Sequence, residues 1–366
     1  MKDVIDQILK HLIPFPKNIG LAVGVINREH SNFFGYGKVK EFGLVSPQGN
    51  TIFEIGSVTK CFTTGLLSLL ISEAKVNLND QVRDLMPELS NFSPDITLER
   101  LATHTSGLPK MPPNIFWTML RHRKNPFAYY PAKKVYQYLS RYHSKQTIDR
   151  KIKYSNLGMA LLGHILANNL DLSYEQAIIN NLCDRLNIQD TRITLNSEQT
   201  QRLAIPHSAK GRVSQNWDLN AFAGAGALRS TVNDLMVFLK AQIGILQIDL
   251  SEKLKLCHEK YLGTFSKPSK VLSLFPDLVK KRKKFKPYFQ VIGLGWIIGN
   301  LGLEGPTLHW IHGATGGYMA FIGFIKSSKA GIVILANRGL NFSEEISGIS
   351  IADEIGFKLL EYLNSI

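Results

Sequence analysis

Ser57 and Lys60 are the two residues whose types and spacing point most directly to chemistry. An apolar, strand-like segment, Phe53–Ile55, leads into Gly56 and Ser57, and apolar residues at helical spacing follow. Residues three apart on a helix share a face, so the Lys60 amine can reach the Ser57 hydroxyl if Ser57 occupies the first turn. A serine hydroxyl is a weak nucleophile until a neighbouring group takes its proton. The pair predicts a nucleophilic serine, and the ordinary alternative is a capping serine before a surface lysine.

Tyr154 and Asn156 could complete such a site. They stand two apart where a loop meets an apolar helix, so both side chains can reach one side of a cleft. The phenol could exchange a proton with Ser57 if a nearby cation lowered its pKa. The alternative interpretation is an Asn N-cap with a packed Tyr.

A third stretch, His312–Tyr318, is rich in small residues and is expected to lie between two strands. Small residues there would let a substrate lie against a strand edge, with a backbone N–H free to act as an oxyanion donor. His104, in the segment Leu101–Pro109, is better interpreted as a histidine that makes hydrogen bonds within a tight turn.

The chain has 366 residues, of which 44% are hydrophobic, enough for one large core or two smaller ones. It has no apolar run near the ~18–20 residues of a membrane span. The N-terminal residues alternate between apolar and charged and do not form a signal peptide, which predicts a cytoplasmic protein as the sequence stands, or a periplasmic or extracellular one if a leader was removed. Cys61, Cys183 and Cys257 are too dispersed for a disulfide framework or a zinc site, and are expected to be buried.

The net charge of +14 is partly concentrated in one stretch, Lys280–Lys286. Charge runs are usually solvated loops, and the alternative here is weak contact with an anionic lipid surface or an acidic polymer. No nucleic-acid-binding module accompanies the charge, so no nucleic-acid partner is expected.

Periodicity predicts strands at both ends of the chain and helices between them. Residues 1–56 and 290–366 would form one α/β subdomain, and residues 57–289 a helical subdomain that includes a poorly patterned basic segment, 248–290. The expected strands are 19–26, 31–37, 291–299, 319–325 and 330–336; the expected helices are 57–74, 96–102, 131–142, 156–170, 173–187, 231–246 and 343–364.

Six motifs occur in one order: F-E-I-G-S-V-T-K, H-T-S-G-L-P, Y-S-N-L-G, G-A-L-R-S-T-x-x-D-L, G-L-G-W and A-T-G-G-Y. Together they make residues 19–337 resemble the class C β-lactamase-related serine hydrolases, the group that includes penicillin-binding DD-peptidases and esterases. The resemblance implies an α+β fold of the β-lactamase/transpeptidase type. An antiparallel sheet flanked by helices would pack on an all-helical subdomain, with the site between them.

The resemblance also implies roles for the motif residues. Ser57 would be the acylated nucleophile, Lys60 its proton acceptor or electrostatic partner, and Tyr154 the general base and acid. Asn156 would orient Lys60 and the substrate amide, and the N–H groups of Ser57 and Ala314 would form the oxyanion hole. Which of Lys60 and Tyr154 takes the first proton stays open. No metal or cofactor is implied.

The sequence departs from the family at the third motif. Relatives usually carry Lys or His four residues before Thr315, where this chain has Ile311, and His312 comes one residue late. The substrate-binding edge, which includes Gly313, is therefore expected to be altered while the nucleophilic residues are complete. The favoured function is a serine hydrolase of an ester or amide in a small molecule or peptide, with esterase activity preferred. The alternatives are a β-lactamase or D-alanyl-D-alanine carboxypeptidase, or a non-catalytic binding or assembly module.

Overall fold

The computed structural model describes residues 1–12, 19–40, 45–93, 95–122, 124–142, 151–261, 264–265 and 287–366. The basic stretch Lys280–Lys286 lies outside these residues, so its role stays a prediction. Along the described parts of the chain, every helix is too short or too polar to cross a membrane.

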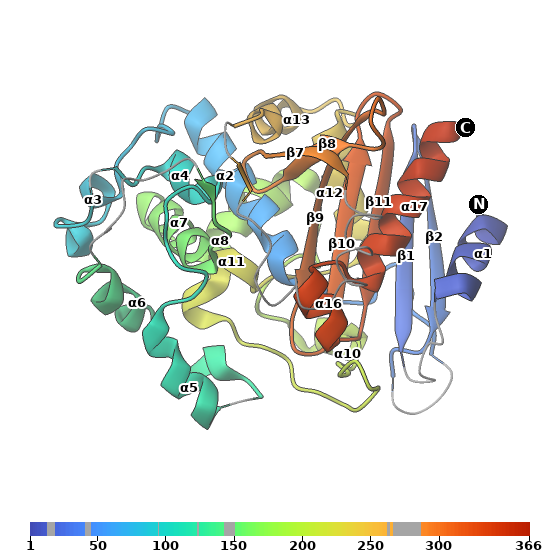
Figure 1. The fold of residues 1–366 in the computed structure, drawn as a ribbon, viewed down its shortest axis with the longest axis horizontal. Coiled ribbons are helices and arrows are strands. Elements are labelled where there is room, and N and C mark those ends of the chain that lie inside the picture. The colour runs from blue at the N-terminus through green and yellow to red at the C-terminus, as the bar shows by residue number, and fades with distance from the viewer. Residues whose placement is uncertain are drawn as a thin grey trace.

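A seven-stranded antiparallel sheet is built from both ends of the chain (Figure 1). N-terminal β1 pairs with C-terminal β11, so the two ends of the chain meet inside the sheet. This confirms the expected antiparallel sheet formed from the two termini. The order across it is β2 (His30–Gly37), β1 (Gly20–Asn27), β11 (Ala330–Ala336), β10 (Met319–Ile325), β9 (Thr307–Ala314), β8 (Ile297–Asn300) and β7 (Tyr288–Ile292).

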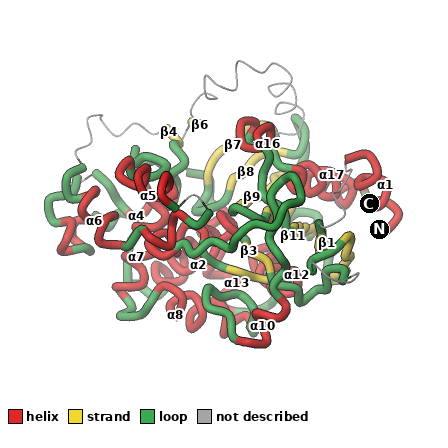
Figure 2. The backbone as a smooth tube through the Cα atoms, turned by 90° about the horizontal axis from the view of Figure 1, so that it is seen from below, coloured by secondary structure: helices red, strands yellow, loops and turns green. Residues whose placement is uncertain are grey.

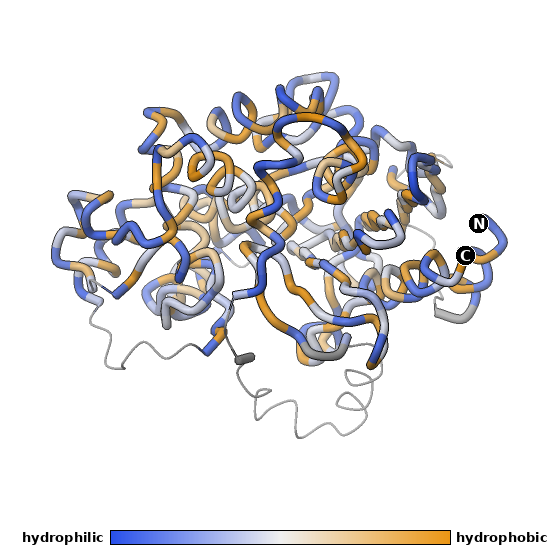
Figure 3. The backbone as a smooth tube through the Cα atoms, turned by 90° about the horizontal axis from the view of Figure 1, so that it is seen from above, coloured by the Kyte–Doolittle hydropathy of each residue, from blue (hydrophilic) through white to orange (hydrophobic). Residues whose placement is uncertain are grey.

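One face of the sheet is covered by the terminal helices α1 (Lys2–Leu12) and α17 (Ile351–Ser365). These helices lie side by side, which brings the two ends of the chain together (Figure 2). Hydrophobic and hydrophilic residues alternate along them, as expected of helices with one buried face (Figure 3). The apolar face packs on the strands, and Ile5, Leu359 and the strand residue Phe321 belong to one core.

The opposite face of the sheet joins the core of the helical subdomain. There α12 (Val232–Ile243) packs directly on β1, β10 and β11, although it lies within the residues predicted for the helical subdomain. Beyond it, α2 (Thr59–Ser72) and α7 (Asn156–Asn169) are almost entirely buried. A single apolar core therefore runs from this face of the sheet into the helices.

The remaining elements are short. The helices are α3 (Val82–Leu85), α4 (Leu98–Ala102), α5 (Phe116–Arg121), α6 (Ala132–Leu139), α8 (Tyr174–Ile178), α9 (Asp184–Leu186), α10 (Ser197–Arg202), α11 (Ala223–Gly226), α13 (Asp249–Lys253) and α16 (Phe342–Ser347). Single turns of other helix types are η1 (Gly56–Val58), η2 (Pro87–Leu89), η3 (Pro113–Ile115), η4 (Pro126–Tyr129), η5 (Ile179–Cys183), η6 (Asn220–Phe222) and η7 (Leu254–His258). Small two-stranded pairs join β3 (Phe53–Glu54) to β5 (Arg229–Ser230) and β4 (Lys151–Ile152) to β6 (Thr264–Phe265).

The structure departs from several expectations, among them the division of the helix expected at 173–187 into α8, η5 and α9. The strand predicted at 291–299 is two strands, β7 and β8, separated by a turn in which Gly295 has a φ of 74°. The helix predicted at 343–364 is divided into α16 and α17, because Gly348 adopts a left-handed φ of 66° and ends the first. The third motif does not begin between strands: its first residues lie inside β9. The three cysteines are buried with free thiols, as predicted.

Candidate active site

Ser57, Lys60 and Tyr154 meet at the junction of the sheet and the helical subdomain. Ser57 lies in η1, immediately before α2, and Lys60 lies in the first turn of α2. Ser57 Oγ is 2.8 Å from Lys60 Nζ and 2.6 Å from the Tyr154 hydroxyl. Lys60 Nζ also donates a hydrogen bond to the Ala225 carbonyl at 2.6 Å, and it lies 4.9 Å from the centre of the Tyr154 ring. The serine hydroxyl is therefore held between two groups that can take or return its proton.

Burial sets the protonation states of these groups. The Lys60 side chain is completely buried, and this desolvation lowers the pKa of its amine well below the ordinary value. The pKa of Tyr154 moves the other way, because burial disfavours its phenolate, although part of the residue is exposed. The sequence-based expectation that a cation would lower the Tyr154 pKa is therefore wrong. A neutral amine and a protonated phenol are the forms that this environment favours.

His104 positions Tyr154 rather than taking part as a base. It occupies a left-handed turn with a φ of 57°, and its ring packs 4.6 Å from that of Tyr154. Its Nδ1 accepts a hydrogen bond from the Ser155 N–H at 3.3 Å. Burial lowers the pKa of His104 to about 3, so the ring stays neutral. This agrees with the prediction of a histidine that makes hydrogen bonds within a turn.

Asn156 lines the site but does not make the bond that the resemblance implies. Ser155, not Asn156, caps α7, because its hydroxyl accepts the Gly158 N–H at 2.9 Å. Asn156 Nδ2 points to Met111 Sδ at 3.7 Å, and no hydrogen bond to Lys60 is present between these described residues. Asn156 Oδ1 is buried and has no hydrogen-bond partner within the described part of the protein. It is therefore an available acceptor for a substrate N–H.

The N–H groups of Ser57 and Ala314 are placed to form an oxyanion hole. Thr315 N donates to Tyr318 O at 3.0 Å, and hydrogen-bonded and non-bonded positions alternate along an antiparallel pair, so the Ala314 N–H points away from β10. On that side β8 pairs with β9 only over residues 307–310. Residues 311–314 of β9 therefore extend beyond β8, and β9 contacts η1. The Ser57 N–H belongs to the first turn of its helix, where N–H groups lack intrahelical partners.

Two glycines allow η1 and β9 to approach each other. A Cβ on Gly56 would lie 2.7 Å from Ala314 N, and the residue has a φ of 49°. A Cβ on Gly313 would lie 2.0 Å from Ile55 O and 2.9 Å from Ser57 N. Any larger residue at either position would separate the strand from the nucleophile.

The register of β9 determines which way the side chains of the altered third motif point. Its pairing with β10 is continuous from Leu308 to Ala314, without a bulge. Ile311 therefore faces the core shared with the helical subdomain and is buried. His312 points to the opposite face, where its Nδ1 lies 3.2 Å from the Asp353 carboxylate on α17. His312 does not replace the missing cation at position 311.

Asp353 influences the charge of His312. The carboxylate is almost completely buried, whereas 41% of the His312 side chain is exposed. Asp353 raises the pKa of His312 above its ordinary value, against the opposing effects of burial and of the nearby Lys60 and Lys110 side chains. The carboxylate therefore extends the pH range over which His312 is protonated, and while it is protonated its charge is balanced by Asp353.

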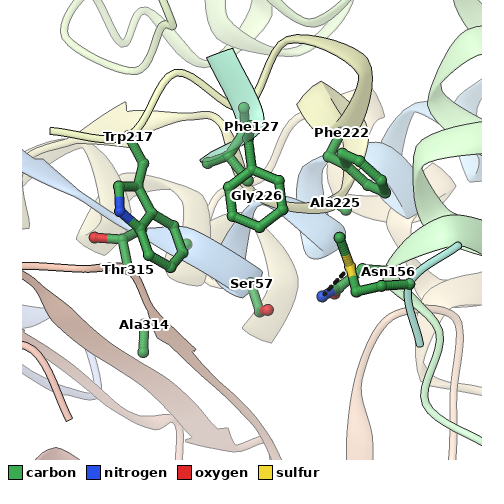
Figure 4. Close-up of a pocket in the computed structure, with 12 residues that line it drawn as sticks. Ser57, Phe127, Asn156, Trp217, Phe222, Ala225, Gly226, Ala314 and Thr315 are labelled. Atoms are coloured by element: carbon green, nitrogen blue, oxygen red, sulfur yellow. Dashed lines mark hydrogen bonds between the residues drawn. The ribbon is translucent and has the colours of Figure 1, made fainter. Parts of the chain in front are cut away.

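An apolar pocket opens beside Ser57 (Figure 4). Phe127, Trp217 and Phe222 form one wall of it, with Phe127 at 5.1 Å from Trp217 and 5.6 Å from Phe222 between ring centres. Thr315 and Ala314 complete the wall on the side of the sheet. Sequence reasoning missed the three aromatic residues, because they come from separate loops with no motif around them.

Glu54 holds the Trp217 backbone at this aromatic wall, and it was not identified from the sequence. It is 3% exposed, and its carboxylate accepts the Trp217 N–H at 2.8 Å. Burial raises the pKa of Glu54 to about 7, in spite of the guanidinium of Arg229 at 3.7 Å. Its position in the sequence, directly before Ile55-Gly56-Ser57, could have indicated that it lies near the site. Among the described residues, no group of three or more His, Cys, Asp or Glu side chains could hold a metal ion.

The fold and this site define a serine hydrolase of the β-lactamase/transpeptidase type. The family model described as Beta-lactamase matches residues 6–354, so the chain belongs to the β-lactamase family. It is 26% identical to the D-alanyl-D-alanine-carboxypeptidase/endopeptidase AmpH of Escherichia coli (strain K12) over 351 residues, covering 92% of this chain and 84% of that protein. It is 24% identical to a beta-lactamase of Pseudomonas fluorescens over 361 residues, covering 94% of this chain and 96% of that protein.

Solved structures show the same fold at lower identity. A class C beta-lactamase superposes with a TM-score of 0.78 at 22% identity, covering 99% of this chain and 97% of that one. The beta-lactamase/D-alanine carboxypeptidase of Pseudomonas syringae gives a TM-score of 0.80 at 17% identity, covering 99% and 98%. The predicted fold and the predicted enzyme class are therefore confirmed.

Proposed function

We propose that this protein hydrolyses esters through an acyl-enzyme on Ser57 and prefers uncharged acyl substrates to penicillins. The observation that carries the preference is the unbroken register of β9, which buries Ile311 where relatives carry a cation. The nearest histidine, His312, is committed to Asp353, so the pair brings no net positive charge to the strand edge. The apolar walls around Ser57 suit an uncharged acyl group.

In the proposed reaction Ser57 Oγ attacks the substrate carbonyl carbon while its proton passes to Lys60 Nζ. The lowered pKa of Lys60 supports the amine, rather than the Tyr154 phenolate, as the first acceptor. The negative oxygen of the tetrahedral intermediate would be stabilised by the N–H groups of Ser57 and Ala314. The Tyr154 hydroxyl, 2.6 Å from Ser57 Oγ, would give a proton to the leaving alkoxide and recover one from Lys60. Water then attacks the acyl group by the same steps, which releases the acid and restores Ser57.

A β-lactamase or D-alanyl-D-alanine carboxypeptidase activity is the second candidate. The names of the similar proteins support it, and so does one cation at the site. Lys110 is exposed, and its carbonyl accepts the Asn156 N–H at 3.0 Å. Its charge contributes to the lowered pKa of Lys60 and opposes the raised pKa of His312, which places it within electrostatic reach of the site. A substrate carboxylate could therefore use Lys110 in place of the missing cation.

The two candidates are separated by comparing kcat/KM for p-nitrophenyl acetate and nitrocefin on one preparation. Loss of a charge-assisted hydrogen bond costs roughly 1.5–3 kcal/mol, or about 10–100-fold in affinity, so nitrocefin should be the poorer substrate. Any effect of Lys110→Gln through the Lys60 pKa is common to both substrates, so the readout is the ratio of nitrocefin turnover to acetate turnover. Nitrocefin hydrolysis at the rate of a dedicated β-lactamase, reduced by Lys110→Gln, would favour the second candidate and contradict the first.

A further inference from the structure

Helix α5 carries its large apolar side chains on the outside of the molecule. Five of the twelve exposed large hydrophobic residues of the described chain lie between residues 116 and 129: Phe116 (56% exposed), Trp117 (66%), Met119 (42%), Leu120 (42%) and Tyr129 (57%). The polar Thr118, in contrast, is buried, and Ile115 is the apolar residue that faces inward. The helix is therefore reversed relative to an ordinary surface helix, whose apolar side faces the core. A concentration of this kind marks an interaction surface rather than scattered surface residues.

The chain on both sides of α5 carries a large excess of positive charge. From Arg100 to Ile148 the chain contains nine Lys and Arg residues and no Asp or Glu. Arg121 and Lys124 follow the apolar residues of α5 directly, and both are exposed. Near α5, the acidic Asp218 accepts a hydrogen bond from Asn125 at 2.8 Å. The apolar face is thus bordered by cations.

The position of α5 links this surface to the pocket beside Ser57. The helix forms a corner of the helical subdomain, away from the sheet (Figure 1). It contacts η4, whose Phe127 lines the pocket, and the carbonyl of Lys124 accepts a hydrogen bond from Trp217 Nε1 at 3.1 Å. A partner bound at α5 would therefore lie close to the pocket.

We propose that α5 and Tyr129 form a docking surface for bilayers that contain anionic phospholipids. Aromatic and aliphatic side chains insert at the boundary between headgroups and acyl chains, while flanking Lys and Arg bind the anionic headgroups. A second copy of this chain fits less well, because the two facing surfaces would carry the same excess of positive charge. The proposal is independent of the proposed esterase activity, since it uses none of the residues around Ser57.

The experiment measures partition of the full chain onto vesicles of equal parts phosphatidylcholine and phosphatidylglycerol at low salt. Phe116→Ser/Trp117→Ser should lower the partition coefficient on the order of tenfold or more, since each apolar group withdrawn from the interface weakens binding. The matched control is Leu303→Ser/Val213→Ser, which removes side chains that are 64% and 57% exposed elsewhere. It should bind like the wild type. Both double variants should show the circular dichroism spectrum and the cooperative thermal unfolding of the wild type, which shows that they are folded.

Two further measurements sharpen the test. Trp117 fluorescence should shift to shorter wavelength on these vesicles, and the shift should be lost in Trp117→Phe. The loss caused by Phe116→Ser/Trp117→Ser should persist in a chain whose Lys280–Lys286 stretch has been neutralised. Wild-type protein that ignores the vesicles, or equal losses in the two double variants, would overturn the proposal. So would a dimer in solution that Phe116→Ser/Trp117→Ser dissociates, because a second copy would then be the occupant.

Discussion

At the scale of single residues, Lys60, Tyr154 and Ser57 form one route for proton transfer. Lys60 and Tyr154 both contact Ser57 Oγ within 2.8 Å, and Lys60 Nζ also lies over the Tyr154 ring. Groups that act as a unit give strongly non-additive losses, because removing one already breaks the route. We therefore expect Lys60→Ala and Tyr154→Phe each to lower kcat by about 10²–10⁴. The double variant should be little worse than either single one.

Steady-state kinetics on one ester substrate check this prediction. A Tyr154→Phe enzyme with nearly full activity would show that the proton passes through Lys60 or water alone. Losses that multiply in the double variant would show that the two residues act independently.

His312 gives the site a pH dependence that should be visible only with anionic substrates. Asp353 raises the pKa of His312, so the imidazolium persists to higher pH than in a free histidine, and the pair is electrically neutral while it lasts. As pH rises through that pKa, the proton is lost and the Asp353 carboxylate is left uncompensated, which repels a substrate carboxylate. We expect the ratio of kcat/KM for a carboxylate-bearing ester to that for a neutral ester to fall with rising pH. The ratio cancels the titration of Lys60, which both substrates share.

His312→Gln is the control for this pH dependence. In that variant the ratio should be flat across the same pH range, because no group at position 312 titrates. A flat ratio in the wild type would show that His312 does not contact the bound substrate's charge.

At the scale of elements, the distance between η1 and β9 is set by two glycines. The Cβ of Gly313→Ala would lie 2.0 Å from Ile55 O and 2.9 Å from Ser57 N, which are both backbone atoms, so β9 must move away from Ser57. The Ala314 N–H moves with it. We expect a loss on the order of 10²–10³ in kcat, as for removal of one oxyanion donor. Gly158→Ala is the matched control, because its Cβ would meet its neighbours at 3.4 Å or more.

The measurement for this pair of variants is kcat together with thermal unfolding. Gly313→Ala should unfold at a lower temperature than Gly158→Ala, so kcat of both variants is measured well below the lower transition, where Gly313→Ala is folded and should still lose activity. Full activity in Gly313→Ala would mean that the oxyanion hole does not depend on this close approach.

At the scale of the whole molecule, much of the fold could be predicted because its elements are locally patterned. The strands near both termini and helices such as α7 have apolar spacing that identifies them, and the motifs placed Ser57, Lys60 and Tyr154 correctly beside one another. The break at Gly348 could not be read from periodicity, because the apolar pattern of 343–364 continues across it.

The rest depends on contacts between distant parts of the chain. His312 and Asp353 are 41 residues apart in the sequence. They meet only because α17 packs on the face of the sheet to which His312 points. The aromatic pocket is assembled from Phe127, Trp217 and Phe222, which no single pattern joins. The reversed face of α5 was also hidden, because Ile115–Leu120 is almost continuously apolar and shows no periodicity that would separate inside from outside.

The central claim, that Ser57 forms the acyl-enzyme, is tested most directly by intact mass spectrometry after incubation with a fluorophosphonate. The structure predicts one adduct per wild-type chain, which peptide mapping places on Ser57, and none in Ser57→Ala. Lys60→Ala should label much more slowly, since the lysine that accepts the serine proton is gone. An adduct on Ser57→Ala at the wild-type rate, or a wild-type chain that no acylating probe modifies, would contradict the account.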